Sequence, residues 1–397
     1  MVVSLPTVPL LSDRPPRGPW VYARQVGRPE HPVDAGALVE VVDDQDRFIG
    51  HAHYNPASDI RLRMLWQGKR SELAHPRGFL ERRLAVADRL RRKVLRLERT
   101  TDAYRVVHAE GDGLSGLIVD RLGDVLVCEH HALGFWHWRA DLTEVLQTLY
   151  EGATIVHRMP DRAARREGLE RVPAPEVIGH LPDEARVHEH GLTFAVRPRD
   201  GHKTGFFCDQ RDARLRLRDL AAGRRVADLC CNGGGFALNA AAGGARSIEA
   251  VDLDETVLDD AARSAELSAS AFTGASPQFV HADAFDWLRG TRGGYGLVIL
   301  DPPKWALGKQ EVEAASRRYV DLNALGIAAA GKDGLVATYS CSGAVDLPTF
   351  LGFVFAAARR AERRIQLLET SGAGADHPQD PDFARSRYLK GALLRVE

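Results

Sequence analysis

The sequence predicts an α/β protein whose C-terminal part is a doubly wound, mostly parallel sheet. From Arg224 onward, apolar strand-like runs alternate with helical segments, and repeated strand–helix units of this kind are typical of parallel sheets. Residues 4–70 contain short β-branched runs between polar turns instead, which predicts a small β-barrel. A middle α/β unit lies between the two. We therefore expect three domains, at residues 1–72, 73–198 and 199–397.

The N-terminal part changes its hydrophobic period near Pro76. Before this point we expect strands at Ala37–Val42, Arg47–His53 and Ile60–Leu65, the last with alternating apolar and charged residues. Pro76–Arg99 then has an apolar stripe at helical spacing with arginines around it. Residues 61–99 hold 13 Lys and Arg against 4 Asp and Glu, in a chain that is otherwise slightly acidic. This basic segment predicts either a solvated helix face or a phosphate-binding surface.

The middle unit is predicted to be mainly β-structure. Strands are expected at Tyr104–His108, Leu117–Asp120, Asp124–His130, Thr154–Met159 and Gly191–Val196. Leu142–Tyr150 is expected to be a helix, and the charged, proline-bounded Asp161–Pro175 a surface loop. The basic stretch Arg197–Gly205 then leads into the last domain.

The C-terminal part alternates two kinds of element. Its expected strands are Val226–Cys231, Ile248–Asp252, Gln278–His281, Leu297–Leu300 and Leu335–Tyr339, with two more near the C-terminus. Its expected helices are Phe236–Ala242, Glu255–Ser268, Glu311–Ala329 and Leu347–Glu362. Because parallel strands share a carboxyl edge, residues that follow these strands are the candidates for a binding site.

A glycine-rich turn, Gly233–Gly235, follows the first of these strands. A dinucleotide-binding fingerprint would need glycine where Leu238 stands, and the Gly-Lys-Ser/Thr of a P-loop is absent. Acidic residues stand at three successive strand ends: Asp228 before the turn, Asp252 on the next strand and Asp283–Ala284 after the third. Carboxylates can accept ribose hydroxyls and an adenine amino group, so this ordered set predicts an S-adenosylmethionine site.

Two further motifs fall at the same edge. Asp301-Pro302-Pro303 follows an apolar strand, and the prolines cannot continue its ladder because they lack an N–H. Cys341 follows another apolar strand and is flanked by serines. Carbon 5 of a pyrimidine is a poor nucleophile, and a thiolate added at carbon 6 would make it enamine-like and able to take a methyl group. Asp301 and Cys341 are therefore the candidate catalytic residues.

The remaining composition excludes other classes of protein. Five cysteines without a CxxC pair argue against zinc sites and a disulfide framework, and Cys128 and Cys208 are expected to be core residues. No apolar run approaches the ~18 residues of a membrane helix, and the N-terminus lacks a basic region before an apolar one. We expect a cytoplasmic protein without metal or membrane attachment.

Several long motifs carry a resemblance to a known family. YNPASDIRLR, EGDGLSGLIVDRLGD, GHKTGFFCDQR, LDPPKW, YSCSG and the terminal ADHP and YLKG resemble the bacterial 23S ribosomal RNA cytosine-carbon-5 methyltransferases, over nearly the whole chain. That family joins an RNA-binding PUA domain to a class I methyltransferase domain, with a middle unit that helps to hold substrate.

The resemblance implies roles for individual residues. Asp301 would contact the target base and Cys341 would be the nucleophile. The cofactor would be lined by Asp228, Asn232, Gly233, Gly234, Gly235, Asp252, Leu253, Asp283, Ala284 and Asp301, with Phe206, Gln210 and Arg211 from a segment packed against it. Two-cysteine enzymes of this chemistry have a cysteine where Lys304 stands, so the base that removes the carbon 5 proton is not identified.

Three alternatives stay open at this point. The chain could methylate a purine nitrogen of RNA, which needs no thiol, or act as a non-catalytic RNA-binding or assembly factor. A small-molecule methyltransferase is disfavoured because about half of the chain lies outside the expected cofactor domain. The expected partner is large-subunit ribosomal RNA. The sequence leaves the target nucleotide open, and the oligomeric state open between monomer and homodimer.

Overall fold

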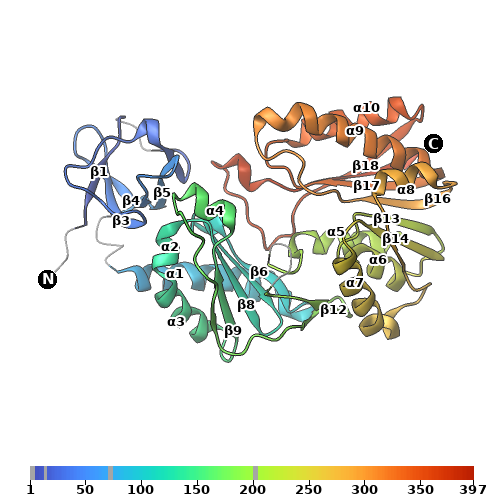
Figure 1. Cartoon of the computed structure of the whole chain (residues 1–397), viewed down its shortest axis with the longest axis horizontal. Helices are drawn as coiled ribbons and strands as arrows, with labels where there is room; N and C mark the ends of the chain where they lie inside the picture. The colour runs from blue at the N-terminus through green and yellow to red at the C-terminus, as the bar shows by residue number, and fades with distance from the viewer. Residues whose placement is uncertain (1–4, 13–15, 70–74, 200–203) are drawn as a thin grey trace.

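The computed structural model describes residues 5–12, 16–69, 75–199 and 204–397. Within them the chain forms two five-stranded sheets, a β-hairpin and a seven-stranded sheet. Figure 1 shows the N-terminal sheet at one end of an elongated molecule and the seven-stranded sheet at the other. The expected boundary after residue 72 and residues 201–203 of the GHKTGFFCDQR motif lie outside the described residues. None of the described helices has the length and hydropathy to cross a membrane.

The N-terminal sheet has the strand order β1-β3-β4-β5-β2. Its strands are β1 (Thr7–Pro9), β2 (Trp20–Tyr22), β3 (Ala37–Val42), β4 (Phe48–Tyr54) and β5 (Ile60–Trp66). Val39, Val41 and Leu62 are fully buried in its core, as the β-branched and alternating patterns predict. The three expected strands are confirmed to within a residue or two. The two short ones, β1 and β2, have too few residues to show a period.

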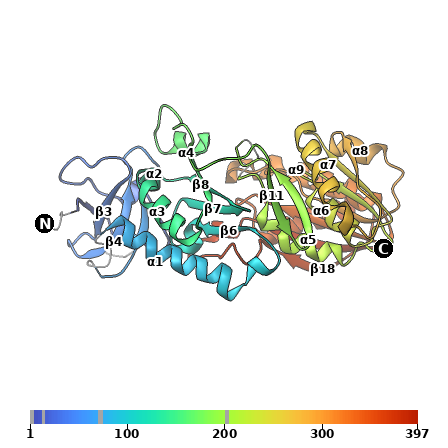
Figure 2. The same ribbon diagram turned by 90° about the horizontal axis from the view of Figure 1, so that it is seen from below.

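The second sheet has the order β10-β9-β8-β7-β6. Its strands are β6 (Ala103–His108), β7 (Leu117–Leu122), β8 (Val125–His130), β9 (Thr154–Arg158) and β10 (Glu176–Ile178). Helices α1 (Pro76–Asp88), α2 (Leu133–His137) and α3 (Arg139–Leu149) pack on one face through a shared apolar cluster. Figure 2 shows α1 lying along this sheet. The hairpin of β11 (Ala185–Glu189) and β12 (Leu192–Val196) packs on the other face.

The expected loop Asp161–Pro175 is wrong in its first part, which is helix α4 (Asp161–Arg166). Ala163 and Ala164 are buried against Leu133 and Met159. Two alanines in six residues give no recognisable helical period, so only the tertiary contact reveals the helix.

The expected single helix Pro76–Arg99 is also wrong, because α1 ends at Asp88 and a π-helical segment, Arg89–Val94, follows it. Its backbone is closed by a bond from Leu95 N to Leu90 O, 2.8 Å long, which inserts one residue into the turn. The insertion rotates the helix face. Val94 of the apolar stripe becomes 65% exposed, and Arg91 is fully buried in its place.

The seven-stranded sheet has the order β15-β14-β13-β16-β17-β19-β18. Its strands are β13 (Arg225–Leu229), β14 (Ser247–Asp252), β15 (Gln278–His281), β16 (Tyr295–Leu300), β17 (Ala330–Ser340), β18 (Ile365–Ser371) and β19 (Lys390–Val396). The first five are parallel, and β19 is antiparallel to both β17 and β18. The predicted doubly wound sheet is confirmed.

Helices cover both faces of this sheet (Figure 1). One face packs on α8 (Ala284–Gly290), α9 (Val312–Ala329) and α10 (Leu347–Arg360), and the other on α5 (Arg211–Arg218), α6 (Gly235–Ala242) and α7 (Glu255–Ser268). Neighbouring strand residues point to opposite faces: Ala227 and Leu229 join the first cluster and Val226 the second. Strands buried on both sides explain the continuous apolar runs in the sequence.

Replacing Arg91 by leucine should strongly destabilise the middle unit. The guanidinium donates to Asp112 at 2.6 and 2.8 Å and to the carbonyls of Arg105 and Asp376, so its loss leaves Asp112 without its ion-pair partner. We expect the free energy of unfolding to fall by about 3–5 kcal/mol. Urea unfolding followed by tryptophan fluorescence measures this. The exposed Arg89→Leu is the matched control, and equal unfolding midpoints for the two variants would contradict the prediction.

Candidate active site

The carboxyl ends of four neighbouring parallel strands bring the candidate residues to one edge of the seven-stranded sheet. Asp228 stands near the end of β13, Asp252 is the last residue of β14, Asp301 follows β16 and Cys341 follows β17. Asp283, two residues beyond β15, lies at the same edge. The parallel register of β13, β14 and β16 makes this convergence a property of the fold, not of any one loop.

The turn after β13 is held in an unusual backbone conformation. Cys230, Asn232 and Gly234 all have positive φ, at 60°, 47° and 74°. The N–H of Asn232 donates to Asp252 Oδ2 at 2.9 Å, which ties the turn to the neighbouring strand. Non-glycine residues adopt this region at a cost and cluster at ligand-binding sites.

The glycines of the turn face different surroundings. A side chain at Gly233 would meet nothing within 4 Å, so the space above this residue is open. At Gly234 it would lie 3.0 Å from Leu238 and 3.1 Å from Ala261, which are packed beneath the turn. Gly235 opens α6 close to Arg214. A ligand can therefore approach the backbone at Gly233 while the other glycines allow close packing.

The buried carboxylate of Asp228 is incompletely hydrogen-bonded. Its Oδ2 accepts from Ala237 N at 3.0 Å, but its Oδ1 has no partner among the described residues. Burial, together with the charges of Asp301 and Asp252, raises the pKa of Asp228 well above its ordinary value. A cationic ligand with hydrogen-bond donors would complement this acidic edge. The sulfonium and ammonium groups of S-adenosylmethionine have these properties, so the residues present fit that cofactor.

The residues expected around the adenosine part lie along the same edge. Asp252 Oδ1 accepts from Asp254 N at 3.0 Å, and the adjoining Leu253 is 66% exposed. Asp283 caps α8, its Oδ1 accepting from the N–H groups of the two residues after Ala284 at 2.9 and 3.1 Å. Ala284 itself is buried. The exposed Leu253 stands between the carboxylates of Asp252 and Asp254 in the sequence. This combination suits a ligand that has one apolar face and polar edges.

The segment before α5 reaches the site through Gln210. Gln210 is buried, and its Nε2 donates to Asp301 Oδ2 at 3.0 Å. Phe206 is half-buried, with its ring 5.1 Å from that of Phe194 and the guanidinium of Arg214 4.9 Å from its centre. These contacts hold the segment against the sheet and orient the Asp301 carboxylate.

Arg211 has a different partner from the one expected. Its guanidinium donates to Asp376 at 2.8 and 3.1 Å in a fully buried pair, so we assign it to the support of the segment. Although burial opposes ionisation, His377 and Arg211 hold the pKa of Asp376 well below its ordinary value. The sequence shows Arg211 next to the site residues, but not that its partner lies 165 positions away.

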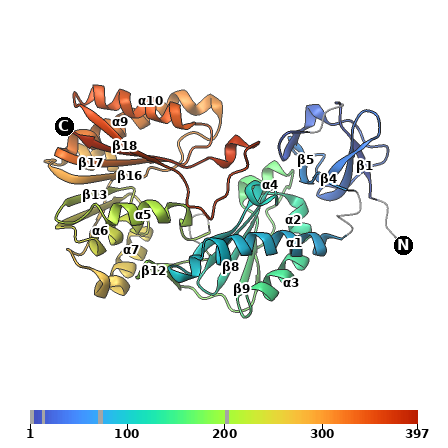
Figure 3. The ribbon, with the colours of Figure 1, turned by 180° about the vertical axis from the view of Figure 1, so that it is seen from behind.

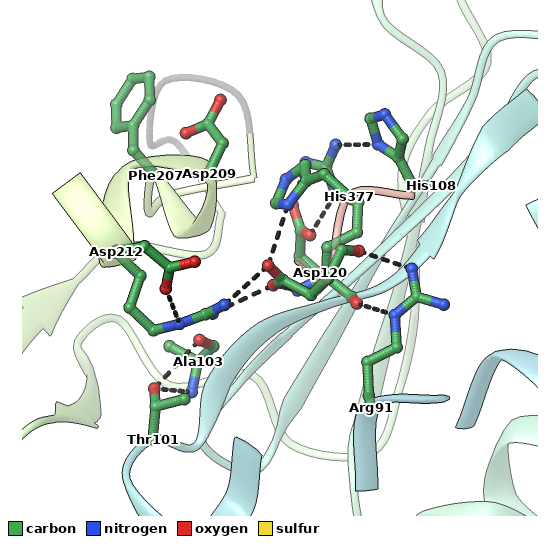
Figure 4. Close-up of polar contacts among 12 residues, drawn as sticks. Arg91, Thr101, Ala103, His108, Asp120, Phe207, Asp209, Asp212 and His377 are labelled. Carbon is green, nitrogen blue, oxygen red and sulfur yellow. Dashed lines mark hydrogen bonds and ion pairs between the residues drawn. The ribbon is translucent and has the colours of Figure 1, made fainter. Parts of the chain in front are cut away.

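The pair of Arg211 and Asp376 belongs to a larger buried network, and Figure 4 is a close-up of polar contacts in this region. The second carboxylate oxygen of Asp376 accepts from Arg105 N at 2.9 Å, and its carbonyl accepts from Arg91 at 2.6 Å. The Arg105 side chain in turn forms a two-bond ion pair with Asp120, at 2.7 and 2.8 Å, and Thr204 donates to the same carboxylate. The C-terminal segment is thus clamped between the second sheet and α5.

Cys341 is half-buried and stands between two buried serines. The hydroxyl of Tyr319 lies 2.8 Å from Ser340 Oγ and 3.0 Å from Ser342 Oγ, and Ala306 N donates to Ser342 Oγ at 3.2 Å. The segment after Asp301 is therefore bonded to the segment around Cys341. Burial raises the pKa of Tyr319, and the charges of Cys341 and Asp301 contribute to that rise.

The thiols of the other four cysteines are held in an unreactive state. Cys128 and Cys208 are buried, as expected for core residues. Burial raises the pKa of the thiol in Cys128, Cys208, Cys230 and Cys231, which keeps each in its unreactive protonated form. Within the described ranges no group of His, Cys, Asp and Glu side chains is arranged to hold a metal ion.

One site residue was missed by the sequence reasoning, namely Lys390 at the start of β19. Lys390 is buried and pairs with Ser340 in the antiparallel register. Its ammonium donates to Ser342 O at 2.6 Å and Tyr388 O at 2.7 Å. Burial lowers the pKa of Lys390 to about 8, with the charge of Cys341 opposing this shift and that of Lys304 adding to it. A lysine opening an otherwise apolar strand was the signal available in the sequence.

Comparison with known proteins gives two matching family models. Residues 17–67 match a PUA-like domain, and residues 174–341 match an S-adenosylmethionine-dependent methyltransferase. These matches confirm the expected fold class and cofactor.

Full-length relatives are also found. The chain is 35% identical to ribosomal RNA large subunit methyltransferase I of Klebsiella pneumoniae strain 342, over 96% of this chain and 94% of the relative. It is equally similar to the protein of that name from Escherichia coli K12, over 96% of each. A solved structure from Streptococcus mutans, described as a SAM-dependent methyltransferase, has the same fold, with a TM-score of 0.81 at 22% identity over 99% of this chain and all of that one.

Replacing Asp252 by asparagine should weaken cofactor binding. The substitution keeps the size of the side chain but removes the charge and one acceptor next to the open space at Gly233. We expect the affinity for S-adenosylhomocysteine to fall at least about tenfold, the factor that about 1.4 kcal/mol of hydrogen bonding gives. Isothermal titration calorimetry measures it. Asp259→Asn, an exposed position on α7, is the control, and unchanged affinity in Asp252→Asn would remove this residue from the cofactor site.

Proposed function

Because this chain belongs to the family of ribosomal RNA large subunit methyltransferase I, we propose that it forms 5-methylcytosine in large-subunit ribosomal RNA. The coarser activity, S-adenosylmethionine-dependent methylation of ribosomal RNA, is that of the family. The finer proposal depends mainly on one observation. Cys341, which is partly exposed, follows strand β17, and Asp301 follows its parallel neighbour β16. A hydrogen bond from Ala306 N to Ser342 Oγ joins the two segments.

The proposed reaction divides the work between two side chains. Bound S-adenosylmethionine supplies an electrophilic methyl group. The thiolate of Cys341 adds to carbon 6 of a cytosine, which moves electron density to carbon 5 and makes that atom able to accept the methyl. Asp301, oriented by Gln210, accepts a hydrogen bond from the exocyclic amine of the base and so holds the ring over the thiol. A water molecule then takes the carbon 5 proton, and the electron pair of that C–H bond breaks the bond between carbon 6 and sulfur, which releases the thiolate and the methylated base.

We also propose that Lys390 holds Cys341 in its reactive thiolate form. Lys390 is fixed by two carbonyls, one of them belonging to Ser342, the residue that follows the cysteine. A fixed ammonium favours an adjacent thiolate by direct attraction. The other charged or titratable groups that face this pair are Lys304, Asp346, Tyr319 and Asp301. Lys390 is a positioning residue here, since it acts through the cysteine.

A covalent trap tests the nucleophile. RNA that carries 5-fluorocytosine should form a denaturation-resistant adduct with the wild type in the presence of S-adenosylmethionine, because fluorine cannot leave as the proton does. Cys341→Ala should form no adduct and lose at least about a thousandfold in methyl transfer, as expected when covalent catalysis is removed. Gel electrophoresis under denaturing conditions measures the adduct.

The matched control for this trap is Cys128→Ala, buried in β8, which should form the adduct at the wild-type rate. Methyl transfer retained by Cys341→Ala would overturn the carbon 5 reaction and favour methylation of a purine nitrogen. Absence of S-adenosylhomocysteine binding in the wild type would instead favour a non-catalytic RNA-binding protein.

The role of Lys390 predicts a pH dependence. Below about pH 8 Lys390 carries its charge, so the wild-type thiol should alkylate faster than that of Lys390→Met. Above this pH the ammonium loses its proton, so the two rates should converge. Iodoacetamide labelling of Cys341 across this range, followed by peptide mass spectrometry, measures the rates without RNA.

Two further variants separate charge from structure. Lys390→Arg keeps the charge above pH 8 and should keep the faster labelling there. Lys332→Met, at the exposed opposite end of β17, should leave the profile unchanged. Coincident profiles for Lys390→Met and the wild type would refute the role of Lys390 while leaving Cys341 as the nucleophile.

A further inference from the structure

The arginines of the basic segment 61–99 are largely occupied by partners within the protein. Five of them contact acidic or aromatic side chains: Arg63 pairs with Glu167, Arg77 with Glu81, Arg91 with Asp112 and Arg92 with Glu98, and Arg83 stacks on Trp66. A guanidinium held in this way contributes less to binding an outside anion, because that partner would have to be displaced.

A different set of arginines is free of such partners. Arg162, Arg165 and Arg166 stand at spacings of three and four on α4 and therefore share one helix face, with the buried Ala163 and Ala164 opposite. All three are exposed, and none forms a hydrogen bond or ion pair with another described residue.

A further arginine, which has no acidic partner among the described residues, comes from near the C-terminus. Arg385 lies in the 3-10 helix Ala384–Ser386, in the segment between β18 and β19. Its guanidinium lies 5.3 Å from the centre of the Trp20 ring, and that of Arg63 lies 5.4 Å from the same ring. Phe383 packs on Trp20 with ring centres 4.7 Å apart. Figures 1 and 3 both show this C-terminal segment beside α4 and β5.

These side chains form one electrostatic cluster. Partial burial, followed by the like charges of Arg162, Arg385 and Arg63, lowers the pKa of Arg166, and the charge of Asp59 opposes this shift. Arg63 is itself balanced by Glu167 at 3.3 Å and Glu110 at 3.9 Å. Within the described part of the chain, the side chains of Arg162, Arg166 and Arg385 form no ion pair with an acid. Repulsion of this kind is relieved when an anion binds.

We propose that Arg162, Arg166 and Arg385 form a phosphate-binding surface for the RNA substrate. This inference rests on the proposed function and names the part of the protein that would hold the RNA backbone. Helix α4 of the middle unit and the C-terminal segment supply the arginines of this cluster. The PUA-like domain adjoins it through Trp20 and Arg63. An extended polyanion can contact all three at once, and planar guanidiniums suit its phosphate oxygens.

The C-terminal segment links this surface to the proposed catalytic residues. Arg385 precedes Lys390 by five positions, and the intervening Tyr388 donates to Asp209 Oδ2 at 2.5 Å beside Gln210. RNA bound to Arg385 would therefore contact the same stretch of chain that leads into β19 at Lys390, next to the loop of Cys341. Phosphate contacts there would position the substrate, and the target base would be selected elsewhere.

The salt dependence of RNA binding tests this proposal. In vitro transcribed 23S ribosomal RNA is titrated with the full-length protein by filter binding at several KCl concentrations. The triple variant Arg162→Gln, Arg166→Gln, Arg385→Gln should bind more weakly than the wild type. The slope of log affinity against log salt should become shallower by about 2–3, since each phosphate contact contributes about 0.7–0.9.

A control variant with the same net charge distinguishes RNA binding at these three arginines from a general effect of the protein's charge. Arg77→Gln, Arg317→Gln, Arg360→Gln removes the same charge from exposed arginines that are paired with acids, and should keep the wild-type slope. The test triple should also keep wild-type S-adenosylhomocysteine affinity, which shows that it folds. Equal slopes for the test triple and the wild type overturn the arginine surface alone. Failure of the wild type to bind the RNA overturns the proposed function as well.

Discussion

The buried carboxylate of Asp376 is the point at which the separate parts of this molecule are held together. It accepts from Arg211 at the start of α5 and from the backbone of β6, while its own carbonyl accepts from Arg91 after α1. Each of these groups would be costly to bury alone, because a charge removed from water needs a partner with good geometry. Here each of these buried groups has a hydrogen-bond partner in the network. The network therefore fixes the positions of the middle unit, the methyltransferase sheet and the C-terminal segment relative to one another.

The active-site geometry depends on this network of hydrogen bonds around Asp376. Gln210, which orients Asp301, directly precedes Arg211, and Tyr388 bonds to Asp209 two residues before Lys390 begins β19. The carboxyl edge of a parallel sheet can bring acids and a cysteine together by itself. It cannot orient a carboxylate or place an ammonium beside a cysteine-bearing loop. The segments before α5 and before β19 do this, and the network around Asp376 holds them in place from outside the sheet.

Much of the fold could be predicted because its signals are local. Helix α7 begins and ends where the apolar period indicates, and β3 and β15 also have the expected bounds. Errors arose where a few residues depended on distant contacts. Arg91 enters the core because one π-turn rotates its helix, and α4 is held by only two small alanines. Neither event leaves a periodic pattern in the sequence.

The sequence by itself determined which segments are strands, the glycine turn at Gly233, and the acids and cysteine that follow the strands. Strand identity and chain direction suffice to place these residues at one edge of a parallel sheet. The tertiary structure alone decided which charges are free. Arg211 proved to be bound by Asp376, and Lys390 proved to lie against the loop of Cys341. The arginine side chains of α4 stayed unpaired, while Arg77, Arg83, Arg91 and Arg92 found acids or aromatic rings. Ion pairs and burial join residues far apart in the chain, and no local pattern records which partner each side chain meets.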